Sequence, residues 1–96
     1  MSPKRWEVAL DAASVRATNL GRTLKSIKAS FHRNELSAQD YFARMAAAVE
    51  KENATLDRLF VENQPPLHPG YSDERLKYSA GQARIRETIK ELCKQL

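Results

Sequence analysis

The 96-residue sequence contains one cysteine and only three glycines, and three of its four prolines lie within residues 65–69. The single cysteine, Cys93, cannot form a disulfide within the chain, so we expect a reducing, cytoplasmic environment. Because glycine and proline are scarce outside that short segment, little interrupts regular secondary structure elsewhere. No alternation of apolar and polar residues typical of strands is present. The sequence therefore favours an all-α fold.

Long apolar runs are also missing. The longest are a few residues, which is far too short for a helix that crosses a bilayer. The N-terminus has the positive charge of a signal peptide, but Glu7 and Asp11 interrupt the apolar segment that such a peptide needs. We therefore expect no membrane partner and a cytoplasmic location.

The motifs of enzymes and metal proteins are absent too, including glycine-rich phosphate loops, His-Glu-x-x-His and Cys-x-x-Cys. His32 and His68 fall near opposite ends of one predicted helix, so we do not expect them to share a metal. Cys93 has no histidine nearby in the sequence, and we interpret it as a small core or interface residue. The prediction is a non-enzymatic protein with no catalytic residue, cofactor, metal site or small-molecule substrate.

A long heptad stripe dominates the first third of the chain and predicts one helix over residues 3–33. Its members repeat at spacings of four and three, which keeps them on one side of a helix, as in coiled coils. Ser2 and Pro3 form a favourable helix start. A break at Asn19-Leu20-Gly21 is the alternative, although the heptad phase continues across the glycine. The stripe consists of Trp6, Leu10, Ala13, Ala17, Leu20, Leu24, Ile27 and Phe31.

A short connection leads to a second helix, predicted over residues 38–62. Ser37 followed by Asp40 resembles a capping box, and a short connection implies antiparallel neighbours. Polar residues Glu52 and Asn53 interrupt the middle of its apolar stripe. That stripe consists of Phe42, Met45, Val49, Leu56, Leu59 and Phe60.

The proline-rich segment 64–71 is predicted to be a linker, because three prolines in five residues cannot be helical. A third helix is expected over residues 73–96, with Ser72 as its N-cap and acidic residues in its first turn. No stop signal precedes Leu96. We expect either a longer natural chain or a C-terminal end that packs against a partner. The stripe of this helix consists of Tyr78, Ile85, Ile89, Leu92 and Leu96.

These segments predict one helical domain over residues 1–96, an antiparallel three-helix bundle with a long first hairpin. Dimerisation could complete its core, since a chain of this length buries a modest fraction of its surface. Antiparallel pairing would place Asn53 level with Gln82, and Gly21 and Gly81 near the same height. This layer is interpreted as fixing the helix register, with a small polar site as the alternative.

Basic residues are concentrated on the first helix, although the net charge is only +4. A basic ridge can contact phosphates without reading bases. No aromatic residue is interleaved with the ridge to stack on single-stranded bases. A solvated face is the simpler interpretation, and nucleic-acid binding is the alternative. The candidate nucleic-acid residues are Arg22, Lys25, Lys28 and Arg33.

Apolar residues outside the main stripes indicate a surface for another helix. Val8, Ala12 and Val15 form a second line on the first helix, and Trp6 either packs inside the bundle or enters a partner's groove. The predicted function is therefore protein–protein interaction by helix docking, with another protein or with a second copy as a homodimer. The candidate partner-binding residues are Trp6, Val8, Ala12, Val15, Leu92 and Leu96.

Overall fold

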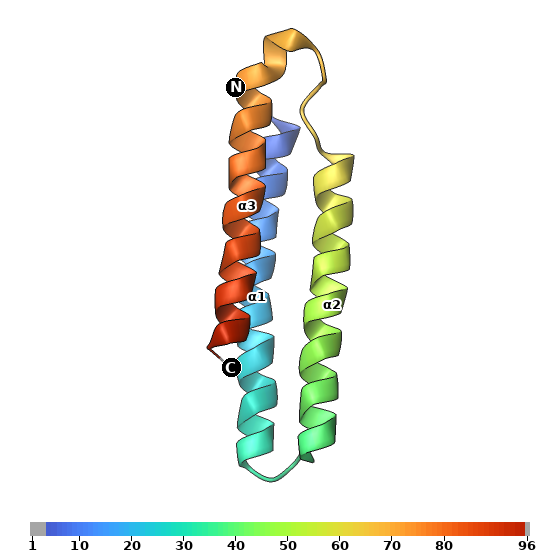
Figure 1. Ribbon diagram of the computed structural model, residues 1–96, viewed down its shortest axis with the longest axis vertical. Coiled ribbons are helices and arrows are strands. Elements are labelled where there is room, and N and C mark those ends of the chain that lie inside the picture. Colours follow the sequence, from blue (N-terminus) through green and yellow to red (C-terminus); the bar gives the residue numbers. More distant parts are fainter. Residues whose placement is uncertain (1–3, 96) are drawn as a thin grey trace.

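The structure, a computed structural model, describes residues 4–95. It contains the helices α1 (Arg5–His32), α2 (Ala38–Glu62) and α3 (Ser72–Lys94), and the short 3₁₀ turn η1 (Pro69–Tyr71). α2 runs antiparallel to both other helices, so α1 and α3 are parallel in a rod of 55 × 23 × 19 Å (Figure 1). The predicted all-α three-helix bundle is confirmed, and the described residues contain no strand.

The heptad stripe of α1 forms the centre of the core, because α1 packs against both α2 and α3. α1 is unbroken at Gly21, so the alternative of a break there is wrong. It begins at Arg5 after Lys4, whereas the predicted start at Ser2 and Pro3 lies outside the described residues. The core cluster consists of Trp6, Ala13, Ala17, Leu20, Leu24, Leu56, Phe60, Tyr78, Ile85 and Ile89.

The turn between α1 and α2 is fixed by local backbone bonds. Asn34 has a φ of 61°, a left-handed conformation that asparagine tolerates better than most residues. The Glu35 N–H donates to the Ser30 carbonyl at 3.0 Å, which satisfies a carbonyl left free at the helix end. Ser37 Oγ then accepts the Asp40 N–H at 3.1 Å, which confirms the predicted N-cap of α2.

The start of α3 differs from the prediction. Ser72 is not the N-cap; it is the first residue of α3, and its hydroxyl donates to the Pro69 carbonyl at 2.7 Å. The 3₁₀ turn before it leads directly into the helix, and His68 Nδ1 caps that turn by accepting the Gly70 N–H at 3.0 Å. A histidine cap was not predicted because serine, threonine, aspartate and asparagine dominate this position in α-helices.

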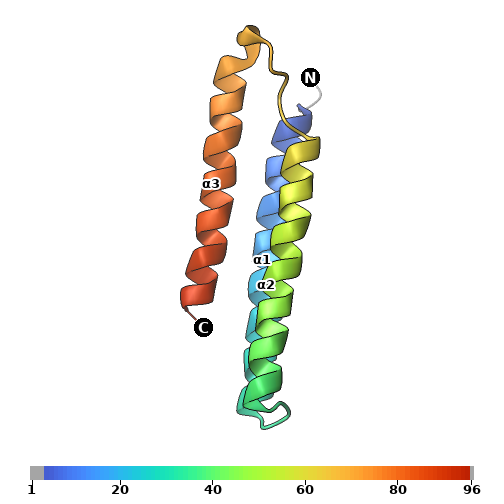
Figure 2. The same ribbon diagram turned by 45° about the vertical axis from the view of Figure 1, so that its right-hand side comes forward.

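The linker sets the position of α3 along the long axis of the bundle, which we call its height. Arg75 Nη1 donates to the Pro66 and His68 carbonyls, both at 2.8 Å, and so holds the linker against the first turn of α3. α3 begins beyond the end of α2, and its described part ends well before the α1–α2 turn (Figures 1 and 2). The prediction that Asn53 and Gln82 lie at the same height in the bundle is therefore wrong. Asn53 lines a hollow with Ile89, whereas Gln82 lines a different one near the linker.

Candidate helix-docking groove

The packing between α2 and α3 is looser than the packing of either helix on α1. At the linker end they meet closely, since the Tyr78 hydroxyl donates to the Phe60 carbonyl at 2.6 Å and the two rings pack edge to face. Further along, Arg86 of α3 and Asp57 of α2 form an ion pair across the boundary between the two helices, which we call the seam. The Arg86 guanidinium lies over the Phe60 ring. Beyond these contacts, the space between the two helices opens to solvent.

An apolar hollow lies on α2 beside the C-terminal end of α3. It is open because α3, as far as the structure describes it, ends before it covers this part of the α1–α2 hairpin (Figure 2). Phe42 is 67% exposed here, although its place in the apolar stripe had predicted a core residue. The hollow is lined by Tyr41, Phe42, Met45, Ala46, Val49 and Cys93.

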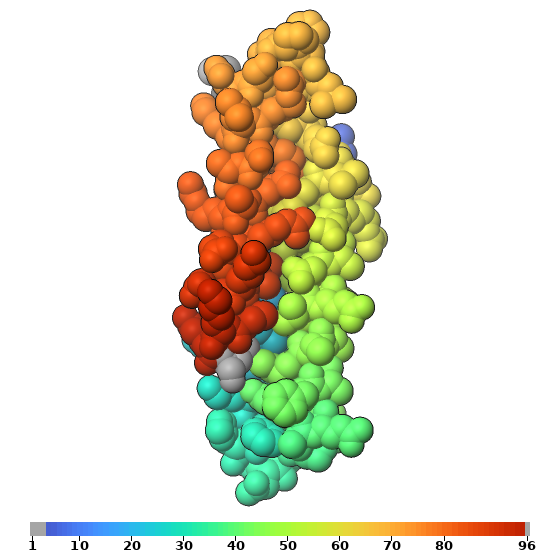
Figure 3. All heavy atoms as spheres, in the orientation of Figure 1, coloured from blue at the N-terminus to red at the C-terminus, as the bar shows by residue number. Residues whose placement is uncertain are grey.

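A second hollow continues the first one up the seam and shares Val49 and Cys93 with it. Figure 3 shows this face, with α3 in orange to red beside α2 in yellow to green. We call the two hollows together the α2–α3 groove. Its remaining lining residues are Asn53, Asp57, Arg86, Ile89, Lys90 and Lys94.

The rim of the α2–α3 groove is positively charged along α3. Arg86, Lys90 and Lys94 line it, and the only acidic residue that lines it in the described chain, Asp57, is already paired with Arg86. Lys94 also contacts Glu91 at 3.3 Å, an exposed pair that contributes little. The groove therefore combines an apolar floor with a basic wall, which suits a ligand that is apolar on one side and acidic beside it.

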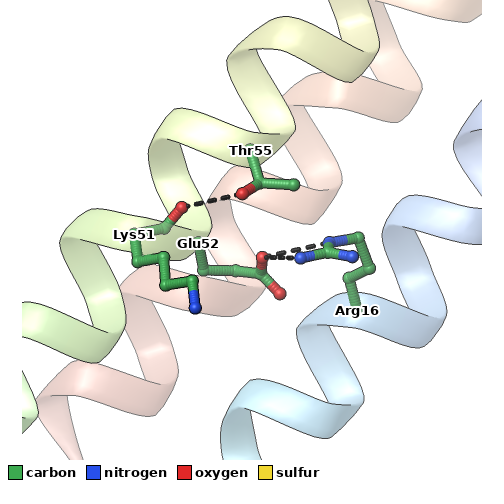
Figure 4. A network of polar contacts seen from close by, with 4 residues as sticks. All are labelled: Arg16, Lys51, Glu52 and Thr55. Atoms are coloured by element: carbon green, nitrogen blue, oxygen red, sulfur yellow. Dashed lines mark hydrogen bonds and ion pairs between the residues drawn. The ribbon is translucent and has the colours of Figure 1, made fainter.

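A partly buried ion pair joins α1 and α2 away from this groove. Arg16 Nε and Nη2 both donate to Glu52 Oε2, at 3.0 and 2.8 Å, and the two side chains point toward each other in Figure 4. Thr55 in the same view donates to the Lys51 carbonyl within α2. Glu52 was correctly placed where the apolar stripe is interrupted, but its partner Arg16 was not predicted. This pair ties two helices together and presents no free reactive group.

Arrangements typical of metal sites and membrane spans are not found in the described residues. No three His, Cys, Asp or Glu side chains lie close enough together to hold a metal ion in residues 4–95. None of the described helices is both long and apolar enough to cross a membrane.

The predicted partner-binding residues fall into three groups. Trp6 is buried, with its ring edge to face against Tyr78 and its Nε1 donating to Glu74 at 3.1 Å, so it packs inside the bundle and offers no free anchor. Leu92 is half-buried and packs on the core, whereas Leu96 lies outside the described residues. The third group is exposed together on α1 and consists of Val8, Ala12 and Val15.

The predicted nucleic-acid residues are only partly available. Arg22 and Lys25 are exposed, and Lys28 is half-buried. Arg33 donates to Glu35 at 2.7 Å, and this hydrogen bond raises the pKa of Arg33 and lowers the pKa of Glu35. The structure thus leaves a short basic patch on α1, without Arg33 as a free member.

Comparison of the chain with protein-family models, with curated proteins and with solved structures gives no match.

Proposed function

We propose that this chain is a non-enzymatic helical interaction module that docks an amphipathic helix in the α2–α3 groove. The observation that carries the proposal is the exposure of Phe42, which continues the apolar stripe of α2 yet lines an open hollow beside the described end of α3. Full burial of such a side chain is worth about 1.5–3 kcal/mol. A helix that covers Phe42 and its neighbours would therefore gain binding energy at this point.

The shape of the groove favours a helix as the ligand. Along α2 it extends from Phe42 to Asp57, which corresponds to roughly 22 Å at 1.5 Å per residue. About four turns of a partner helix match that length and would present apolar residues at spacings of three and four. The lysines at the rim favour acidic residues beside the partner's apolar stripe.

A cytoplasmic location remains part of the proposal, since Cys93 is free and exposed at the groove. Nucleic-acid binding through Arg22, Lys25 and Lys28 is the rival function. It receives less support, because Arg33 is engaged by Glu35 and Lys28 is half-buried.

The test is a pull-down from native lysate with the wild-type chain, Phe42→Glu and Val61→Glu as baits. Phe42 and Val61 are 67% and 68% exposed on the same helix, but only Phe42 lines the groove, so Val61→Glu is a matched control. We expect wild type and Val61→Glu to capture the same protein chains, identified by mass spectrometry, and Phe42→Glu to lose them. Each capture is repeated after nuclease treatment.

Equal capture by all three baits would overturn the groove as the binding site. Loss of captured material after nuclease treatment would instead favour the nucleic-acid alternative. Circular dichroism spectra of the three baits should coincide, because both substitutions are made at exposed positions.

A further inference from the structure

We infer that the α2–α3 groove binds a second copy of this chain. The helix that docks there is α1 of that copy, and it enters the groove with its outer face. This inference rests on the proposed function, because it names the ligand of the same groove. The outer α1 face is defined by the apolar residues Val8, Ala12 and Val15 and the acidic residues Glu7 and Asp11.

The outer α1 face has the spacing of a docking helix. Val8, Ala12 and Val15 are four and three residues apart, so they share one side of α1, opposite the stripe that faces α2 and α3. Val8 is 49% exposed and Val15 is 59% exposed, and Ala12 between them is exposed as well. A small residue between two larger ones allows close approach of another helix.

The charge beside this apolar line is acidic. Glu7 and Asp11 are exposed, and neither forms an ion pair within residues 4–95. The nearby basic residues Lys4 and Arg16 are paired with Glu74 and Glu52. Arg5 keeps its positive charge, because its hydrogen-bond partner Asn63 is neutral. Two unpaired carboxylates and one uncompensated guanidinium leave this end of the outer α1 face with a net negative charge.

The groove offers the complementary pattern. Its floor contains Met45, Val49 and Ile89, and its α3 wall presents Lys90 and Lys94. An outer α1 face placed in the groove would bring acidic residues to the lysines and valines to the apolar floor. Complementary charges at an interface favour the correct partner and the rate of encounter.

The two surfaces lie on opposite sides of the molecule. α1 is behind α2 and α3 in Figure 1, whereas the groove opens on the front face in Figure 3. One pair of copies cannot bury both surfaces reciprocally, so the contact is head to tail and continues to further copies. Two-fold pairing of two grooves is disfavoured, because the basic walls of both copies would take part.

The test uses Cys93, the sole cysteine, as a reporter inside the groove. A Cys93→Ser/Ala12→Cys variant is mixed with wild type and treated with a short bismaleimide. We expect cross-linked heterodimers between position 12 of one copy and Cys93 of the other. The matched control is Cys93→Ser/Ala47→Cys, at an exposed alanine of α2 that does not line the groove. This control should give at most roughly one tenth of the product that the Ala12→Cys variant gives.

A charge swap tests the specificity of the contact. Glu7→Lys with Asp11→Lys on the Ala12→Cys copy should lower the cross-linking yield roughly tenfold, since like charges then meet at the groove. Lys90→Glu with Lys94→Glu on the Cys93 copy should have the same effect. Mixing the two charge-reversed copies should restore the yield, which a merely unfolded variant would not do.

Sedimentation of the wild-type chain should show a weight-average mass that rises with concentration and falls with added salt. A constant monomer mass without the position 12 to Cys93 product would overturn the inference; loss of lysate capture by Phe42→Glu would then leave the proposed function standing. Cross-links between two Cys93 residues alone would indicate two-fold pairing and overturn the head-to-tail arrangement. If Phe42→Glu also leaves lysate capture unchanged, the proposed function fails with it.

Discussion

Gly81 of α3 lies against Leu10 of α1 so closely that a Cβ atom at position 81 would be 2.7 Å from Leu10 Cδ1. The relationship is reciprocal further along the same pair of helices. A Cβ at Gly21 of α1 would lie 3.3 Å from Leu92 Cδ2 of α3. Each helix thus places a glycine opposite a leucine of the other, and this lets α1 and α3 pack closely in parallel.

Gly81→Ala should destabilise the chain by about 1 kcal/mol, the balance of two opposing effects. Alanine gains about 1 kcal/mol in helix propensity, but overpacking costs about 1–3 kcal/mol. The second effect is larger here because Cδ1, Cδ2 and Cγ of Leu10 all lie within 3.3 Å of the added atom. Thermal unfolding should show a midpoint about 4–8 °C lower than that of wild type.

Two controls separate sterics from propensity. Gly21→Ala meets only the two terminal methyls of Leu92, at 3.3 and 3.6 Å, so the propensity gain should dominate and stability should rise by about 0.5 kcal/mol. In a Leu10→Ala background, Gly81→Ala should become neutral or stabilising. A destabilising effect of Gly81→Ala that persists without the leucine would contradict the steric explanation.

The glycines show where sequence reasoning reaches its limit. Heptad spacing and local capping signals predicted the α2 bounds, the Ser37 cap and the continuity of α1. The height of α3 depends on how Arg75 and the 3₁₀ turn hold the linker, and no periodic pattern encodes that. Gly21 and Gly81 were therefore interpreted as part of a mid-bundle polar layer, although each packs on a leucine.

The position of the candidate groove could not be predicted from local sequence patterns either. Phe42 belongs to the apolar stripe of α2 in the sequence, and nothing local distinguishes it from Leu56, which is fully buried. The difference is tertiary, since Leu56 belongs to the buried core cluster, whereas Phe42 lines an open hollow near the described end of α3. The exposed line of Val8, Ala12 and Val15 could be predicted, because it lies opposite the main stripe of the same helix.

Arg16→Met should cost more stability than Glu52→Leu, although both break the same ion pair. The Glu52 side chain is 11% exposed and would be left without its partner, whereas Arg16 is 43% exposed and can reach water. We expect a loss of about 1–3 kcal/mol for Arg16→Met and a near-neutral effect for Glu52→Leu, measured by urea unfolding. The double variant should resemble Glu52→Leu. Equal losses in the two single variants would show that desolvation of Glu52 is not the cause.

Tyr78 should make the chain sensitive to alkali. Tyr78 is 3% exposed, and burial raises the pKa of its hydroxyl above the ordinary value of 10.0. The unfolded state therefore loses this proton first as pH rises, and the stability due to neutral Tyr78 is lost above about pH 10. Tyr78→Phe removes the hydrogen bond to the Phe60 carbonyl and should cost about 0.5–1.5 kcal/mol at neutral pH.

The wild-type advantage over Tyr78→Phe should shrink when urea unfolding is repeated above pH 10. Tyr71→Phe, at a 39% exposed tyrosine, serves as the control for general effects of removing a phenol. A wild-type advantage that stays constant through the alkaline range would contradict the assignment to Tyr78.

Arg22→Glu, Lys25→Glu and Lys28→Glu in combination should leave protein capture unchanged if docking in the groove is the function. None of the three lines the groove.

If all three contacted phosphates of duplex DNA, the logarithm of the affinity would fall with the logarithm of the salt concentration at a slope of about −2.7. Titration of a labelled duplex with the wild-type chain over increasing salt measures that slope directly. We expect binding no tighter than the non-specific range of about 10⁻⁴–10⁻⁶ M at physiological salt. Tighter binding that the triple reversal abolishes, together with full duplex binding by Phe42→Glu, would move the function to the basic patch on α1.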